Sequence, residues 1–171
     1  MTPVRRRPSQ GFTLIELIVV ITIIAILAAV ALPRLMDAQK DARTAKANAI
    51  YGAIRAASAL AHSRCELDLA SARTGLNVCD PAGGGRVDME GVAVTMVNRY
   101  PTANAQGIQA AAAINVTADG LVILNAGGTG AGATMTFSLV GAPSPTTCRI
   151  SYTASALVGA GPVIEVETTG C

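Results

Sequence analysis

The stretch that decides the fold is Arg5-Arg6-Arg7-Pro8-Ser9-Gln10-Gly11-Phe12-Thr13-Leu14-Ile15-Glu16-Leu17. A short basic leader ends at Gly11, and a run that reaches Leu32 then begins, apolar apart from Thr13, Glu16 and Thr22. The run is long enough to cross a membrane as a helix. It also holds a carboxylate near its start, and a charge in hydrocarbon is costly unless it is paired. Glu16 is therefore a candidate functional residue.

The charge of the chain is concentrated in this leader. The formal net charge is +2, but a chain that begins at Phe12 lacks Arg5, Arg6 and Arg7 and has ten basic against eleven acidic side chains. A nearly neutral chain without a polycationic patch is not expected to have nucleic acid as its main partner. Basic residues beside a membrane span stay on the cytoplasmic side, so the C-terminal part is expected to face outward.

An ordinary secretory signal is an alternative reading of the N-terminus. Such a signal has an apolar core of roughly 7–15 residues followed by a small-residue cleavage site, which Ala28-Ala29-Val30-Ala31 resembles. The longer apolar run, the acid at Glu16 and the helical pattern after Pro33 argue for a retained anchor.

A second helical section is predicted from about Arg34 to Ser63. Its apolar and small residues recur at three- and four-residue spacing, which is typical of an amphipathic helix. Pro33 separates the two sections, because a proline removes a helical hydrogen bond and usually bends or ends the helix. Two interpretations follow: a helix end at Pro33, or one long helix with a kink there. We favour the second, since good helix formers continue on both sides.

The texture changes after Ser63, where Gly, Pro, Thr and Asn become common. Residues 65–88 are expected to form an irregular connection with little helix. Alternating or short apolar runs bounded by Gly and Pro then predict an antiparallel sheet, and Gln106–Ile114 is ambiguous between helix and loop. The glycines of 127–132 are expected to form a hairpin turn. The predicted strands are Val92–Val97, Leu121–Leu124, Thr134–Val140, Cys148–Thr153 and Val163–Glu167.

Four cysteines follow the anchor: Cys65, Cys79, Cys148 and Cys171. An even number in an exported chain suggests disulfides, and four cysteines allow three connectivities. We favour Cys65–Cys79 with Cys148–Cys171, because each bond closes a local loop. A metal site is the alternative, but neither a CxxC pair nor clustered histidines support it.

Catalytic and cofactor motifs are lacking in the sequence. His62 is the only histidine, and its place near a helix end suggests a surface or capping role. Asp80, Asp88 and Glu90 do not have the spacing of a calcium loop, and the glycine-rich run lacks a P-loop ending. No catalytic residue, metal ligand or cofactor is therefore predicted.

The N-terminus resembles the processing motif of type IV pilins and of the related pseudopilins of type II secretion. The resemblance rests on the basic leader, Gly11-Phe12, the acid at Glu16 and the apolar helix, and it covers roughly Arg5 to Ala61. It implies an α+β pilin fold, in which the C-terminal half of a long N-terminal helix packs on an antiparallel sheet. The section Asp37–Ser63, together with the ending from Cys148 to Cys171, looks most like the mannose-sensitive haemagglutinin branch of pilins.

The resemblance also implies a set of parts and roles. Residues 1–11 would be a leader removed by prepilin peptidase after Gly11, and Phe12 would become an N-methylated N-terminus. Glu16 would pair with the Phe12 ammonium of a neighbouring subunit, although an unpaired acid at the headgroup boundary is the alternative. Residues 12–33 would form the membrane and filament-core helix, 34–63 the amphipathic helix, and 64–171 the connection and sheet.

The function implied is that of a structural subunit and not of an enzyme. The precursor would wait in the inner membrane with its N-terminus in the cytoplasm. Machinery with an external ATPase would then assemble many copies into an extracellular helical filament for adhesion, motility or DNA uptake. The alternatives are a pseudopilin of type II secretion and, more remotely, a membrane-tethered secreted enzyme.

Overall fold

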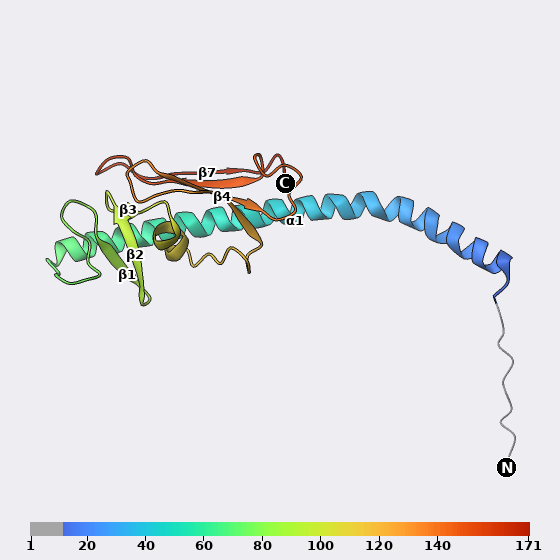
Figure 1. The fold of residues 1–171 in the computed structure, drawn as a ribbon, viewed down its shortest axis with the longest axis horizontal. Coiled ribbons are helices and arrows are strands. Elements are labelled where there is room, and N and C mark those ends of the chain that lie inside the picture. The colour runs from blue at the N-terminus through green and yellow to red at the C-terminus, as the bar shows by residue number, and fades with distance from the viewer. Residues whose placement is uncertain (1–11) are drawn as a thin grey trace, which may run out of the picture. The chain divides into compact units, whose positions relative to one another are not determined.

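The computed structural model describes residues 12–171, which fold as an α+β protein with antiparallel sheets, as predicted. The chain divides into two compact units, Met1–Gln39 and Lys40–Cys171. The elements in chain order are α1 (Leu14–Ala70), β1 (Arg86–Met89), β2 (Val92–Val97), β3 (Tyr100–Pro101), a short π-type helical turn (Ala105–Gln109), β4 (Leu121–Ala126), β5 (Thr134–Leu139), β6 (Arg149–Thr153) and β7 (Val163–Glu167) (Figure 1).

The helix α1 begins at a hydrogen-bonded cap and runs through Pro33 without ending there. The Thr13 hydroxyl accepts a hydrogen bond from the Glu16 N–H at 3.3 Å, which satisfies one of the free amide groups of the first turn. Of the two interpretations of Pro33, the helix end is thus wrong. The kink at Pro33 stays a prediction.

The helix was expected to end at Ser63, and residues 65–88 were expected to form an irregular connection. Both predictions are wrong, because secondary structure extends into the expected connection from each side. The helix continues to Ala70, and residues 86–89 form β1. The buried face of the helix explains the extension, because Ala61, Cys65 and Asp68 follow one another at four- and three-residue spacing and are all buried. A tight turn at Glu90-Gly91, where both residues have positive φ, joins β1 to β2.

The strands form two antiparallel sheets in sequential order. One contains β1-β2-β3 and the other contains β4-β5-β6-β7. The predicted strands correspond to β2, β4, β5, β6 and β7, whereas β1 and the two-residue β3 were not predicted. The glycine-rich residues 127–132 connect β4 to β5, where a turn is expected. Gln106–Ile114 begins with the π-type turn, which includes Gly107 in a non-helical conformation.

The unit Lys40–Cys171 holds two apolar cores along the helix. The first joins Ala47 and Ile54 of α1 to the four-stranded sheet, including Phe137 and Tyr152. The second joins Ala61 and Cys65 to β1 and β2. The C-terminal half of α1 therefore packs on sheet surfaces, as the pilin resemblance implies.

Candidate functional site

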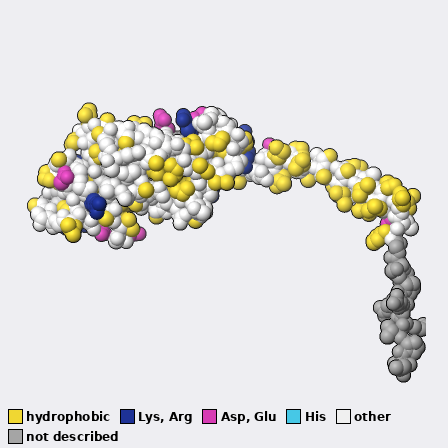
Figure 2. Space-filling view, in the orientation of Figure 1, with side chains coloured by type: hydrophobic (Ala, Val, Ile, Leu, Met, Phe, Trp, Pro, Cys, Tyr) yellow, Lys and Arg dark blue, Asp and Glu magenta, His cyan; other side chains and the backbone are white. Residues whose placement is uncertain are grey.

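The N-terminal part of α1 is an apolar surface that no described residue covers. Every residue from Phe12 to Ala42 is exposed, including Phe12 at 86 %, Ile15 at 72 % and Leu35 at 56 %. In the described chain α1 is the one helix long and apolar enough to cross a membrane, and its most apolar window has a mean hydropathy of 3.0 with none of it buried. Figure 2 shows these apolar side chains along the narrow, exposed part of the helix.

Exposure on this scale is unfavourable in water. Burying one large aliphatic side chain contributes roughly 1.5–3 kcal/mol, so the large apolar residues between Phe12 and Met36 together represent several tens of kcal/mol. A contiguous apolar surface of this size marks a membrane or protein contact. The segment therefore requires either lipid or other protein chains around it.

Glu16 is an exposed side chain in the first turn of this apolar helix. It forms no ion pair with another described residue. Its position three residues after Thr13 is that of the acid in a Ser/Thr-x-x-Glu capping box, and a carboxylate there is favoured by the helix dipole. Sequence reasoning missed this local role, although Thr13-Leu14-Ile15-Glu16 carries its signal.

The processing residues lie at the edge of the described chain. Phe12 is the first described residue, whereas Gly11 and the leader arginines lie outside the described residues. The Phe12 side chain is exposed. Cleavage of the bond between Gly11 and Phe12 stays a prediction.

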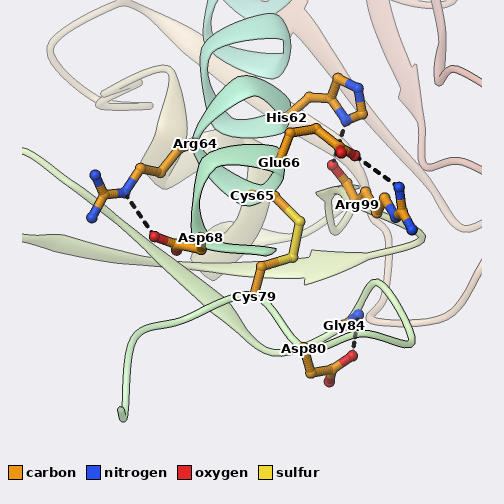
Figure 3. The surroundings of a disulfide bond; sticks show 9 residues. All are labelled: His62, Arg64, Cys65, Glu66, Asp68, Cys79, Asp80, Gly84 and Arg99. Atoms are coloured by element: carbon orange, nitrogen blue, oxygen red, sulfur yellow. Dashed lines mark hydrogen bonds and ion pairs between the residues drawn. A yellow bond between two sulfur atoms is a disulfide. The ribbon is translucent and has the colours of Figure 1, made fainter. Parts of the chain in front are cut away.

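The four cysteines form two disulfide bonds, between Cys65 and Cys79 and between Cys148 and Cys171. These are the two pairs that the sequence favours. The Cα atoms are 5.1 Å apart in the first pair and 4.8 Å in the second. Cys65–Cys79 ties the last turns of α1 to the segment before β1 (Figure 3). Cys148–Cys171 holds Cys171 in a buried position at the start of β6, where Arg43 donates a hydrogen bond to the Cys171 carbonyl.

The end of α1 also holds polar side chains that fasten the β2–β3 turn (Figure 3). His62 Nδ1 donates to the Arg99 carbonyl at 3.0 Å, and its ring stacks on Tyr100 with centroids 4.2 Å apart. Since a carbonyl only accepts, the Nδ1 atom carries the proton. Arg99 in turn bonds Glu66 at 3.0 Å. His62 is thus a packing and hydrogen-bonding residue of the helix end.

Asp68 was not singled out in the sequence, because it lies in a segment expected to be irregular. Its side chain is 1 % exposed and lies 3.5 Å from both Arg64 and Arg73. The pair with Arg73 links the last helical turn to the residues that follow. Buried carboxylates are usually paired in this way. Among residues 12–171, no group of three or more His, Cys, Asp or Glu side chains is placed to hold a metal ion.

Comparisons with known proteins agree with the geometry of the N-terminal helix. Residues 6–32 match the family model of the prokaryotic N-terminal methylation motif. The chain is 40 % identical over 81 residues to the type IV narrow pilus major component PilA5 of Thermus thermophilus, with 44 % of this chain and 63 % of that protein covered. It is 64 % identical over 36 residues to the type IV wide pilus major component PilA4 of the same organism.

Over its N-terminal part the chain is similar to type IV pilins. The methylation motif and the apolar N-terminal helix fit a membrane-anchored precursor that becomes part of a pilus. The chain spans 63 % of the length of PilA5, and the match to PilA4 covers 21 % of this chain and 28 % of that protein. No solved structure matches the chain significantly. The mannose-sensitive haemagglutinin branch stays a prediction.

Proposed function

We propose that the chain is a structural subunit of a type IV pilus, which assembles with copies of itself into a helical surface filament. The observation that carries this proposal is the exposed apolar helix from Phe12 to Met36, which needs lipid before assembly and protein afterwards. The similarity to PilA5 and PilA4, which are major components of type IV pili, supports it. The chain is accordingly proposed to be non-enzymatic, with no cofactor of its own.

The precursor reaches this state by processing at the inner membrane. Arg5, Arg6 and Arg7 hold the N-terminus in the cytoplasm, in line with the positive-inside rule. Prepilin peptidase cuts after Gly11, and the new N-terminus at Phe12 is methylated. Machinery driven by an external ATPase then extracts the subunit, and the finished filament serves adhesion, motility or DNA uptake.

Cleavage creates the charge that Glu16 pairs with in the filament. The Phe12 ammonium lies just before the helix cap, where the positive end of the helix dipole disfavours it. A carboxylate and an ammonium that are each costly to bury alone stabilise one another when they are brought together. One such pair per subunit also sets the register of otherwise smooth apolar helices, in the way that a single buried polar residue does in coiled coils.

Two substitutions at Glu16 separate this pairing from the capping role. Glu16→Gln keeps a side chain that a capping box accepts but removes the charge, whereas Glu16→Ala removes both. If the charge drives assembly, both variants lose sheared filaments while their cleavage remains normal, and Asp37→Asn on the same helix assembles normally. Filaments from Glu16→Gln at the wild-type level would contradict the pairing and leave the cap as the role of Glu16.

The function itself is tested on filaments sheared from cells that express the chain at its native level. Intact mass and N-terminal fragmentation are expected to find methylated Phe12 at the N-terminus and two intact disulfides, and Gly11→Val is expected to retain the leader. Absence of the chain from surface filaments would reject the pilus role and favour a pseudopilin. An N-terminus elsewhere, together with hydrolytic activity, would favour a tethered enzyme.

A further inference from the structure

A groove lies between one side of α1 and the start of β7, within the unit Lys40–Cys171. Its volume is about 300 Å³, which is at the lower end of the range for sites that hold small molecules. The main residues of its walls are Arg55, Ala59 and His62 of α1, Tyr100 of β3, and Pro162 and Ile164 at the start of β7. Because three separate elements form these walls, the groove exists only in the folded subunit.

The two long walls of the groove differ in polarity. The three α1 residues follow one another at four- and three-residue spacing, so they share one side of the helix. On the other wall, Ile164 packs against the apolar core, as Val166 does. Successive side chains of a strand point to opposite faces, so Glu165 points away from the groove. The strand β7 therefore contributes an apolar wall, and the charge in the groove comes from α1.

Arg55 is a cation that the subunit does not neutralise. Its side chain is exposed and forms no ion pair with a described residue. Among the described residues that line the groove, none is aspartate or glutamate. Glu66, one turn beyond His62 on α1, already bonds Arg99 at 3.0 Å. The Arg55 guanidinium is therefore available to an anion, and a carboxylate matches its geometry through two parallel hydrogen bonds.

His62 adds a fixed hydrogen-bond acceptor to the groove. Its Nδ1 atom donates to the Arg99 carbonyl, so the neutral ring carries a lone pair on Nε2. Figure 3 shows this second nitrogen directed away from that carbonyl. The ring is held by its stack on Tyr100, with an angle of 4° between the two planes. An acceptor held in one orientation suits a ligand hydroxyl, which can donate to it.

We propose that this groove binds a small hydroxylated carboxylate, of the chemical class of the uronic acids. The carboxylate bonds the Arg55 guanidinium, and a hydroxyl of the ligand donates to His62 Nε2. The carbon skeleton packs against Ala59, Pro162 and Ile164. Arg55 and His62 are seven residues apart, or about 10 Å along the helix, and the long arginine side chain shortens the gap that one ligand has to bridge. This binding is a property of the single subunit and does not depend on filament assembly.

The ring signals of His62 in an NMR titration test the site directly, because His62 is the only histidine in the chain. D-glucuronate added to the detergent-solubilised full chain is expected to shift these signals and to saturate in the millimolar range. D-glucose, which lacks the carboxylate, and acetate, which lacks the hydroxyls, are expected to shift them much less at equal concentration. No shift with glucuronate, or an equal shift with glucose or with acetate, would overturn the proposal.

A pair of arginine variants then tests the role of Arg55. Arg55→Gln removes the charge at an exposed position, so the fold is expected to persist and glucuronate binding is expected to weaken about ten-fold or more. Arg86→Gln, at an exposed arginine of β1, is the matched control and is expected to bind as the wild-type chain does. Wild-type affinity in Arg55→Gln, or an equal loss in both variants, would reject the site. Either result would leave the pilus function standing, since that function is measured on filaments.

Discussion

The two parts of α1 form one continuous helix but have opposite environments. From Phe12 to Gln39 every described residue is exposed, whereas the part within Lys40–Cys171 buries Ala47, Ile54, Ala61 and Cys65 against strands of the same chain. The second part is stabilised within its own subunit. The first part depends on molecules outside it. A single helix thus joins a segment that is buried within its own subunit to a segment that is exposed in the isolated subunit.

An isoleucine-to-alanine substitution is expected to destabilise the subunit in one part of α1 and the filament in the other. The loss of subunit stability is the largest effect that we predict. Ile54 is fully buried, so Ile54→Ala should lower the free energy of unfolding by about 2–5 kcal/mol. Ile24 is 57 % exposed, so Ile24→Ala should leave the unfolding of the detergent-solubilised subunit unchanged and weaken the filament. Urea unfolding and heat dissociation of filaments measure the two effects. Equal unfolding losses would remove the contrast between the two parts.

The disulfides belong to the self-sufficient part, and their loss ranks next. Each bond closes a loop, with sequence separations of 14 residues for Cys65–Cys79 and 23 for Cys148–Cys171. Cross-links of this size stabilise by roughly 3 kcal/mol in the chain-entropy model. Replacing either pair by serine should therefore lower the urea midpoint of the subunit. An unchanged midpoint would show that packing alone holds the segment that the disulfide closes. Leu76 is 97 % exposed, so Leu76→Ala serves as a control for the effect of a surface substitution.

A smaller effect is expected at Tyr152, which is fully buried and donates a hydrogen bond to the Pro101 carbonyl at 2.8 Å. Tyr152→Phe should cost about 1 kcal/mol, with an additional loss if the carbonyl is left unsatisfied. Burial raises the pKa of the Tyr152 hydroxyl above its ordinary range. The unfolded chain therefore ionises first, and the stability of the subunit should fall as the pH rises above about 10.

Unfolding measured across the alkaline range checks the effect of pH on Tyr152. The decline above about pH 10 should be shallower in Tyr152→Phe than in the wild-type chain, because the remaining tyrosines are not fully buried. Identical slopes in the two chains would show that another group causes the alkaline loss.

Sequence reasoning was most successful where a pattern is local. The apolar run from Phe12 to Leu32 indicates a helix, and the alternation of apolar and polar residues in Val163–Glu167 indicates a strand. Both patterns are local, and both elements were predicted. The end of α1 was misplaced because its burial comes from distant strands: Cys65 packs with Val87 and Val94. Asp68 was missed for the same reason, since its two arginine partners do not mark it as buried. The edge positions of β4 and β7 depend on strand order, which the composition of either strand does not reveal.

The scarcity of lysine and arginine in the C-terminal part of the chain has a consequence for its resistance to proteases. Between Tyr100 and Cys171, Arg149 is the only lysine or arginine. It lies in β6, between β5 and β7, where its backbone is part of the sheet. Trypsin-like proteases therefore have one cleavage site between Tyr100 and Cys171. That site lies in a central strand, which must unfold before it can enter the cleft of a protease. Digestion of an intact subunit would begin instead in the segment after α1, at exposed residues such as Arg73.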